Sequence, residues 1–342
     1  MSMQGVKVPG TKYIPDDDEN YRAPGQYGRI LLFCGSASDE LGQEIAQHLH
    51  LKTGSYTRTV FPNENIFIRL NESVRGQDVY LIQTLSAPCL HENIFEMLIM
   101  IDTLKRDSAG RINVVVPYLS YARSDKKDQP RVGIAARLLA NMIEVAGVDR
   151  YITIDLHAGQ IQGFFNIPGD ALTAFHLLSD YVNDKHIENL VVVSTDLGFA
   201  KKGRNWAEKL GTPHAIIEKR RSGNDSKSEA LSIIGDVRDQ NVLLVDDEVL
   251  TGGSITNAVN LVKGEGARDV YLAFVHPLLA DSAADRLAAL DIKEIITTNT
   301  LPISPEKRAK LPNMKILSVA PLLGEVIWRT NQGRSVGELF NE

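Results

Sequence analysis

The chain has 342 residues, and 37 Lys and Arg stand against 43 Asp and Glu, so its formal net charge is −6. An acidic balance argues against a protein that coats nucleic acid, and no apolar run approaches the roughly 18 residues of a membrane span. Two cysteines, Cys34 and Cys89, are too few for a disulfide framework and fit a reducing compartment, where each would be a small buried hydrophobe. We therefore expect a cytoplasmic enzyme of about two domains, with neither nucleic acid nor membrane as a partner.

Residues 1–28 show no hydrophobic periodicity and are punctuated by glycine and proline. We expect this segment to be an irregular N-terminal arm. An apolar strand is predicted at 29–34, followed by a polar loop and an amphipathic helix that ends near His48. Ser38 directly precedes Asp39 and Glu40, which makes it the predicted N-cap of that helix.

Short apolar runs rich in valine and isoleucine recur along the rest of the chain, with helical stretches between most of them. Runs that are apolar on both faces and alternate with helices predict parallel sheets, so the fold class is α/β. The predicted strands are 79–83, 112–116, 151–155, 190–193, 242–245, 270–275 and 292–298, and two of the predicted helices are 135–145 and 255–263.

Two stretches of the chain, residues 77–117 and 240–273, resemble each other weakly. Each reads as a strand, a loop, a helix and a second strand. The likeness indicates a duplicated α/β domain. Chance similarity between two βαβ units explains the pattern about equally well.

The strongest local motif lies between residues 242 and 255. An apolar strand ends in Asp246 and Asp247, and the loop Thr251-Gly252-Gly253-Ser254 then opens a helix. A glycine-rich turn at a helix N-terminus presents N–H groups and a positive dipole to phosphate. Carboxylates at the end of the strand can hold sugar hydroxyls or a metal.

Two further strand ends carry polar chemistry. One reads Asp155-Leu-His157-Ala-Gly, and a histidine in such a place is more often structural than a ligand. The other leads through Asp196 to Lys201 and Lys202, a combination that suits a metal-bridged polyphosphate but also an ordinary solvated loop. Zinc is not indicated, because the chain has neither HExxH nor CxxC.

Two charged runs are more ambiguous. The segment 121–128 contains Arg123 and Asp128, and a solvated, salt-bridged loop is the simpler interpretation of it. Glu218 to Arg221 place three adjacent cations before a polar stretch, which predicts a mobile phosphate-binding lid or, equally, a basic surface loop.

Taken together, these motifs resemble the ribose-phosphate pyrophosphokinases, the phosphoribosyl pyrophosphate (PRPP) synthetases. The resemblance runs from about residue 29 to 340 and is most specific in Asp155-Leu-His-Ala with Gln-Ile-Gln-Gly-Phe-Phe165. It implies two tandem type I phosphoribosyltransferase-like domains with parallel sheets. We expect them at 29–173 and 174–329, with the segment 330–342 packing on the first.

The resemblance also implies transfer of the β,γ-diphosphoryl group of ATP to the anomeric hydroxyl of ribose 5-phosphate, with Mg²⁺, in a homo-oligomer built from dimers, up to a hexamer. By matching position, the phosphate loop and the two neighbouring carboxylates would hold ribose 5-phosphate. The other matching positions imply a role for Lys219 and Arg221 in transition-state stabilisation, for His157 and Asp196 near Mg²⁺, and for Phe61, Asn63, Arg123 and Asp128 at an ATP site shared with a neighbouring subunit.

Five positions depart from the pattern of that family. Leu250 replaces the third aspartate of the usual Asp-Asp-x-x-Asp-Thr, and Asn65, Ser124, Thr195 and Phe199 also differ. Leucine cannot accept a hydrogen bond from a sugar. Two alternatives therefore stand beside a PRPP synthetase: diphosphoryl transfer to a different acceptor with a ribose 5-phosphate end, such as ADP-ribose, and a non-catalytic regulatory subunit.

Overall fold

The computed structural model describes residues 26–221 and 229–339 of the chain. Its strands are β1 (Ile30–Cys34), β2 (Tyr56–Val60), β3 (Ile66–Leu70), β4 (Asp78–Ile82), β5 (Arg111–Val116), β6 (Arg150–Ile154), β7 (Gly169–Leu172), β8 (Leu190–Ser194), β9 (His214–Arg221), β10 (Glu229–Ile234), β11 (Asn241–Glu248), β12 (Val270–His276), β13 (Glu294–Thr298) and β14 (Met314–Leu317). Its helices are α1 (Asp39–His48), α2 (Leu90–Arg106), α3 (Ala135–Ala146), α4 (Phe175–Asn183), α5 (Ala200–Leu210), α6 (Gly253–Gly264), α7 (Ala283–Ala288), α8 (Pro305–Lys310) and α9 (Ala320–Asn331), with short 3₁₀ turns η2 (Gly159–Phe164) and η3 (Gly337–Leu339).

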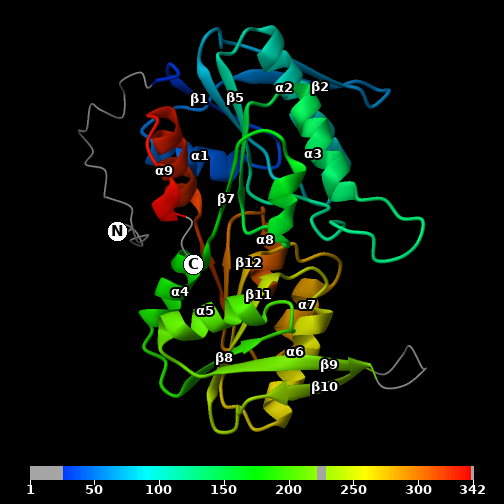
Figure 1. Cartoon of the computed structure of the whole chain (residues 1–342), viewed down its shortest axis with the longest axis vertical. Coiled ribbons are helices and arrows are strands. Elements are labelled where there is room, and N and C mark those ends of the chain that lie inside the picture. The colour runs from blue at the N-terminus through cyan, green and yellow to red at the C-terminus, as the bar shows by residue number, and fades with distance from the viewer. Residues whose placement is uncertain (1–25, 222–228, 340–342) are drawn as a thin grey trace.

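The first sheet has the order β1-β4-β5-β6-β7, and all of its neighbouring strands are parallel. Helices α2 and α3 cover one face, and α1 and α9 cover the other (Figure 1). Both faces are therefore buried, which explains why β4 and β5 are continuous apolar runs instead of alternating ones. The predicted α/β class is confirmed.

The second sheet has the order β10-β9-β8-β11-β12-β13-β14. Its strands are parallel except for β10, which pairs with β9 in the antiparallel sense. Helices α4 and α5 pack on one face, while α6 and α7 pack on the other (Figure 1). One continuous apolar core includes α1, α4, α5 and α9 and joins the two sheets.

The predicted strands and the two named helices are confirmed to within a few residues. Two antiparallel ribbons were not predicted, β2 with β3 and β9 with β10. The second ribbon corrects the interpretation of the basic segment, because the backbone through Arg221 forms a strand. The rest of the predicted lid, residues 222–228, and most of the predicted arm, residues 1–25, lie outside the described residues.

The chain returns to the first sheet after β14. Helix α9, which packs against α1, makes this return. Most of α9 precedes residues 330–342, the segment that was expected to pack on the first domain. Figure 1 shows the two helices side by side next to the first sheet. The division of the chain between residues 173 and 174 falls between β7 and α4 and stays a prediction.

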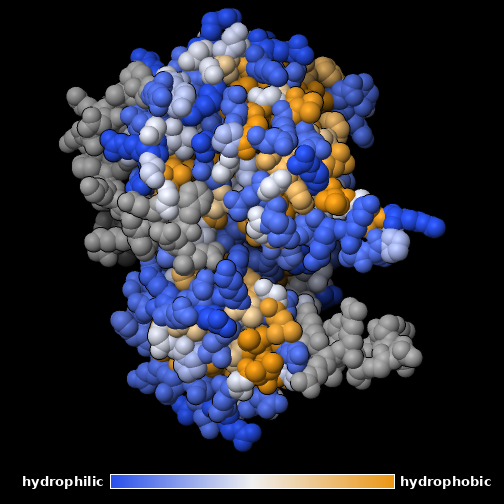
Figure 2. Space-filling view, viewed as in Figure 1, coloured by the Kyte–Doolittle hydropathy of each residue, from blue (hydrophilic) through white to orange (hydrophobic). Residues whose placement is uncertain are grey.

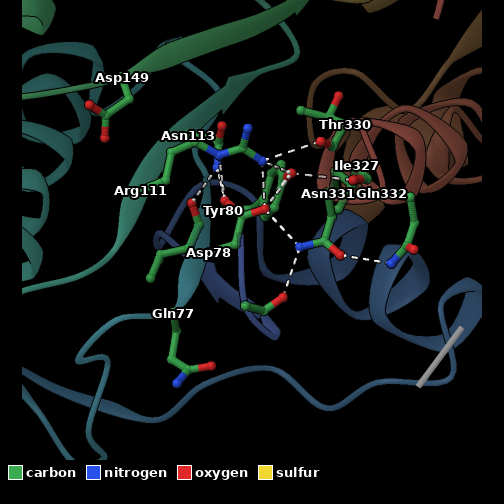
Figure 3. Close-up of polar contacts among 12 residues, drawn as sticks. Gln77, Asp78, Tyr80, Arg111, Asn113, Asp149, Ile327, Thr330, Asn331 and Gln332 are labelled. Atoms are coloured by element: carbon green, nitrogen blue, oxygen red, sulfur yellow. Dashed lines mark hydrogen bonds and ion pairs between the residues drawn. The ribbon is translucent and has the colours of Figure 1, made fainter. Parts of the chain in front are cut away.

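A buried polar network fixes α9 to the first sheet (Figure 3). The carboxylate of Asp78, which is fully buried, accepts hydrogen bonds from Arg111 Nε (2.7 Å) and Nη2 (2.6 Å), Asn113 Nδ2 (2.8 Å) and Tyr80 OH (3.0 Å). Asn331 at the end of α9 adds a further bond of 2.9 Å from its Nδ2. A buried charge is tolerated only when it is paired and hydrogen-bonded, and here both conditions hold.

Two local predictions were wrong. Ser38 does precede the first residue of α1, but its hydroxyl accepts from the backbone N–H of Thr84 at 2.8 Å and makes no cap bond to the helix. The N–H of Thr84, which is distant in sequence, thus takes the place of a helix N–H as the donor to Ser38. The prediction that both cysteines are buried holds only for Cys34, where burial raises the pKa of the thiol to about 12. Cys89 is exposed at the start of α2.

Part of the surface is apolar on the side where α2 and α3 lie (Figure 2). Phe95 on α2 and Leu138 and Val145 on α3 are all exposed. Exposed apolar patches of this kind mark interaction sites more often than chance. Within the described residues, no helix combines the length and apolar character needed to cross a bilayer.

The two sheets are also linked by His276, the last residue of β12. Its buried ring donates from Nε2 to the backbone carbonyl of Asp155 (3.1 Å), and its Nδ1 lies 3.0 Å from the Thr300 hydroxyl. A carbonyl can only accept, so Nε2 carries the proton and Nδ1 accepts. Burial lowers the pKa of His276 below its ordinary value, which keeps the ring neutral.

Acidification is therefore expected to remove the stabilisation that His276 provides. The unfolded chain takes up a proton on His276 below about pH 6.5, while the buried ring resists it, so the stabilising effect is complete above that pH and is lost below it. We expect the difference in Tm between the wild type and His276→Gln to shrink between about pH 8 and about pH 5. A difference that widens on acidification would show instead that the folded ring is charged.

Candidate active site

A cavity of about 300 Å³ lies where β8 and β11 end, facing the loops that follow β5 and β6. The carboxyl ends of parallel strands meet at this edge, the usual place for ligands in α/β proteins. The cavity is lined by Arg123, His157, Thr195, Asp196, Asp246, Asp247, Glu248, Val249, Leu250, Thr251, Gly252, Gly253, Ser254 and Ile255. It therefore collects side chains from both sheets.

The loop Thr251–Ser254 forms one wall of this cavity. Gly252 has a φ of 76°, a left-handed conformation that strains residues with a side chain, and it caps the N-terminus of α6. Arg286 Nη1 donates to the carbonyl of Thr251 at 3.0 Å and holds the loop from outside. The first N–H groups of a 12-residue helix thus face the cavity, which is an arrangement that binds phosphate.

The opposite wall carries an ion pair between the two sheets. His157 Nδ1 donates to Asp247 Oδ2 across 2.6 Å. Burial opposes ionisation of Asp247, but the hydrogen bond and charge of His157, together with the hydrogen bond to Asp246, outweigh it and lower the pKa of the carboxyl to about 2. The same hydrogen bond raises the pKa of His157 above its ordinary value. Each partner therefore favours the charged form of the other.

Asp246 has a different environment from its neighbour. Burial and the adjacent Asp247 raise the pKa of Asp246 well above its usual range. Its Oδ2 accepts a 2.7 Å hydrogen bond from the Thr195 hydroxyl, and its Oδ1 accepts from the Asp247 N–H. Thr195, one of the five departures, thus lies directly against a predicted ribose-binding carboxylate.

The remaining charged groups of the cavity come from three segments. Asp196 follows β8, and its Oδ1 accepts from the N–H of Phe199 at 3.0 Å. Arg123 reaches the cavity from the loop after β5 and forms an ion pair with Glu248, the last residue of β11. Glu248 was not among the predicted site residues, although it directly follows the two predicted aspartates.

The structure does not bring every predicted site residue to this cavity. Phe61 and Asn63 belong to the turn between β2 and β3, where Phe61 packs against Phe67 and is about half exposed. Asp128 is exposed on the loop before α3 and does not line the cavity. Lys219 and Arg221 lie at the end of β9, and their side chains are not among those that the structure describes.

Three of the departures also have distinct places. Leu250 lines the cavity, as its position in the motif predicts. Phe199 does not line the main cavity but lines a separate one of about 20 Å³, together with Trp206, Asp246 and Asp247. Ser124 accepts from the N–H of Ala135 at the start of α3 and does not line the main cavity.

Comparisons with known proteins agree on one family. A family model described as the N-terminal domain of ribose phosphate pyrophosphokinase matches residues 30–147, and one described as the phosphoribosyl synthetase-associated domain matches residues 223–341. A ribose-phosphate pyrophosphokinase of Campylobacter jejuni is 42% identical over 309 residues, which cover 90% of this chain and 98% of that protein. A chloroplastic ribose-phosphate pyrophosphokinase of Arabidopsis thaliana is 44% identical over 315 residues, or 91% of this chain and 77% of that protein.

A solved structure extends the likeness to the fold. The crystal structure of a phosphoribosylpyrophosphate synthetase from Mycobacterium smegmatis superposes with a TM-score of 0.84 at 42% sequence identity. The match covers 89% of this chain and 99% of that one. The similarity therefore includes both sheets and the cavity between them.

Proposed function

Because the chain belongs to the ribose-phosphate pyrophosphokinase family, we propose that it transfers the β,γ-diphosphoryl group of ATP to the anomeric hydroxyl of ribose 5-phosphate. The anomeric oxygen forms a bond to the β-phosphorus and loses its proton. The bond between the β-phosphorus and the oxygen that bridges it to the α-phosphate breaks, and AMP leaves with that electron pair. The observation that carries the proposal is the cavity that combines a phosphate loop with paired carboxylates.

The acceptor would bind along the β11 edge of the cavity. The N–H groups and hydroxyls of Thr251–Ser254 would hold the 5-phosphate, because a helix N-terminus favours an anion. Asp246 and Asp247 would accept hydrogen bonds from the ribose hydroxyls. This arrangement aims the anomeric hydroxyl into the cavity, where positioning contributes much of the catalysis of a phosphoryl transfer.

The donor would bind on the side of the cavity formed by the first sheet. Arg123 and His157 offer positive charge to the phosphates of ATP. Lys219 and Arg221 are proposed to stabilise the transition state from the end of β9. Phe61, Asn63 and Asp128 would contribute to ATP binding in a homo-oligomer, in which a neighbouring copy supplies part of the site. The apolar surface over α2 and α3 is compatible with such an assembly (Figure 2).

Magnesium fits the chemistry of the residues present. No three His, Cys, Asp or Glu side chains within residues 26–221 and 229–339 form a metal cage by themselves. Mg²⁺ commonly takes one or two protein carboxylates and completes its shell with water and substrate phosphates. Asp196 would supply such a carboxylate, with His157 beside it, and the bound ion would offset the charge of the polyphosphate. We further propose a cytoplasmic location, which the reduced cysteines favour.

An assay of AMP release from Mg-ATP tests the proposal. Purified protein is incubated with ribose 5-phosphate, with ADP-ribose or with no acceptor. AMP that depends on ribose 5-phosphate supports a PRPP synthetase. AMP with ADP-ribose alone would identify a different acceptor, and no AMP with either would contradict the proposed activity.

Leu250 gives a more specific prediction. Its side chain lines the cavity beside the proposed ribose carboxylates but accepts no hydrogen bond. Leu250→Asp restores a charged acceptor, and we expect it to raise kcat/KM for ribose 5-phosphate about tenfold. Initial rates at varied ribose 5-phosphate and fixed ATP check this, with Ile234→Asp on β10, which is exposed and does not line the cavity, as the control. An unchanged or lower value for Leu250→Asp would show that Leu250 is already matched to its substrate.

A further inference from the structure

The ion pair between Arg123 and Glu248 joins the two sheets at the rim of the cavity. The closest atoms of the pair are Arg123 Nε and Oε1 of Glu248. The two side chains differ greatly in burial, since 54% of Arg123 is exposed and only 3% of Glu248. Both residues line the cavity, but the carboxylate is the buried partner and the guanidinium is the exposed one.

Glu248 is itself held in place by its neighbours. It ends β11, and in the register of the sheet it lies opposite the buried His276 of β12. Burial and the nearby carboxylate of Glu248 raise the pKa of Tyr118, and the Tyr118 ring packs edge-on against the His276 ring with centroids 5.0 Å apart. A carboxylate surrounded in this way has little freedom to follow a moving arginine.

Arg123 has more donors than the one closest to Glu248. An arginine has five N–H donors, and the closest contact with Glu248 is made by Nε. Among the described residues, no other carboxylate forms an ion pair with Arg123. The arginine lines a cavity that also contains His157 and the phosphate loop. The N–H groups that Glu248 does not take are thus available to the oxygens of a bound polyphosphate.

We propose that Glu248 is a positioning residue for the diphosphoryl donor: its buried carboxylate holds the Arg123 guanidinium at the cavity, where the guanidinium contacts the phosphates of ATP. The inference rests on the proposed function, because it takes ATP as the ligand of Arg123. A long arginine side chain that is held before the ligand arrives loses less conformational entropy on binding. Glu248 therefore acts on donor binding through Arg123 and touches no substrate.

The variant Glu248→Gln tests this role, since it keeps the size of the side chain and removes its charge. We expect KM for ATP to rise about tenfold, because the arginine loses a charge-assisted hydrogen bond and its preferred orientation. KM for ribose 5-phosphate should change less than about twofold, because the acceptor residues stay in place. Direct titration with α,β-methylene-ATP should show the same loss of affinity.

Asp170→Asn is the matched control. Asp170 also forms a largely buried ion pair with an arginine, Arg150, but at the far end of the first sheet and away from the cavity. This variant should lower Tm as a lost ion pair does, with the KM for ATP unchanged. A general loss of stability would thus appear in both variants, whereas a loss of ATP affinity would appear only in Glu248→Gln.

The proposal is overturned if the KM for ATP of Glu248→Gln equals that of the wild type. It is also overturned if that KM is lower, which would mean that Glu248 competes with the phosphates for Arg123. If Glu248→Gln does not fold, the shorter Glu248→Asp is judged by the same criterion. Should the wild type bind α,β-methylene-ATP but release no AMP, the proposed function fails while the titrations still decide the role of Glu248.

Discussion

Replacing Asp247 by asparagine is expected to lower kcat/KM for AMP formation with ribose 5-phosphate by about 100-fold. The carboxylate of Asp247 is buried, stays ionised because its pKa is lowered to about 2, and pairs with His157 across 2.6 Å. Asparagine removes the negative charge that would accept a hydrogen bond from a ribose hydroxyl. It also removes the ion pair with the His157 imidazole. Two interactions of the site are thus lost in one substitution.

Steady-state rates at saturating Mg-ATP measure this loss. The control is Asp291→Asn, an exposed carboxylate that pairs with Lys263 on the surface and lies outside the cavity. We expect its rates to match those of the wild type. If Asp247→Asn retained kcat/KM within threefold, neither the acceptor role of Asp247 nor its pairing with His157 would matter for the reaction.

The largest effect on stability is expected from Arg111→Met, which should lower the free energy of unfolding by about 3–5 kcal/mol. Arg111 makes two hydrogen bonds to the fully buried carboxylate of Asp78 (Figure 3). Methionine keeps much of the apolar stem but leaves that charge without its cation. Because Asn331 of α9 binds the same carboxylate, we expect α9 to detach more easily as well.

Urea unfolding followed by circular dichroism measures the change, and hydrogen exchange over α9 locates it. The exposed pair of Asp102 and Arg106 on α2 supplies the control, since Asp102→Ala should leave the unfolding midpoint unchanged. Equal effects of the two variants would mean that the buried network contributes no more than a surface ion pair.

Most of the architecture was predictable because its strands are buried on both faces. Runs such as those of β4, β5 and β12 cannot be mistaken for solvent-exposed structure, and their alternation with helices determines the class. Asp196, Asp247 and Ser254 line one cavity because polar residues that follow parallel strands gather at one edge of a sheet, and only the family resemblance predicted their proximity.

The ribbons and the pairings across the sheets were not predictable in this way. β2 and β9 contain Thr, His, Lys or Arg beside their apolar residues, so their sequences resemble polar loops. The pairing of Arg123 with Glu248 joins residues that are 125 positions apart, and no local pattern predicts it. Ser38 was misjudged for a similar reason, because a distant N–H took the place of the helix as its partner.

The chemical identity of the product tests the central claim most directly. Purified protein, Mg-ATP and ribose 5-phosphate are incubated together, and the sugar product is examined by mass spectrometry and ³¹P NMR. We predict a sugar that carries a new diphosphate on its anomeric oxygen, formed in equal amount with AMP and formed about 100-fold more slowly in the Asp247→Asn reaction at low ribose 5-phosphate. A sugar that gains a single phosphoryl group with release of ADP, or ATP cleavage that leaves ribose 5-phosphate unchanged, would contradict diphosphoryl transfer at this site.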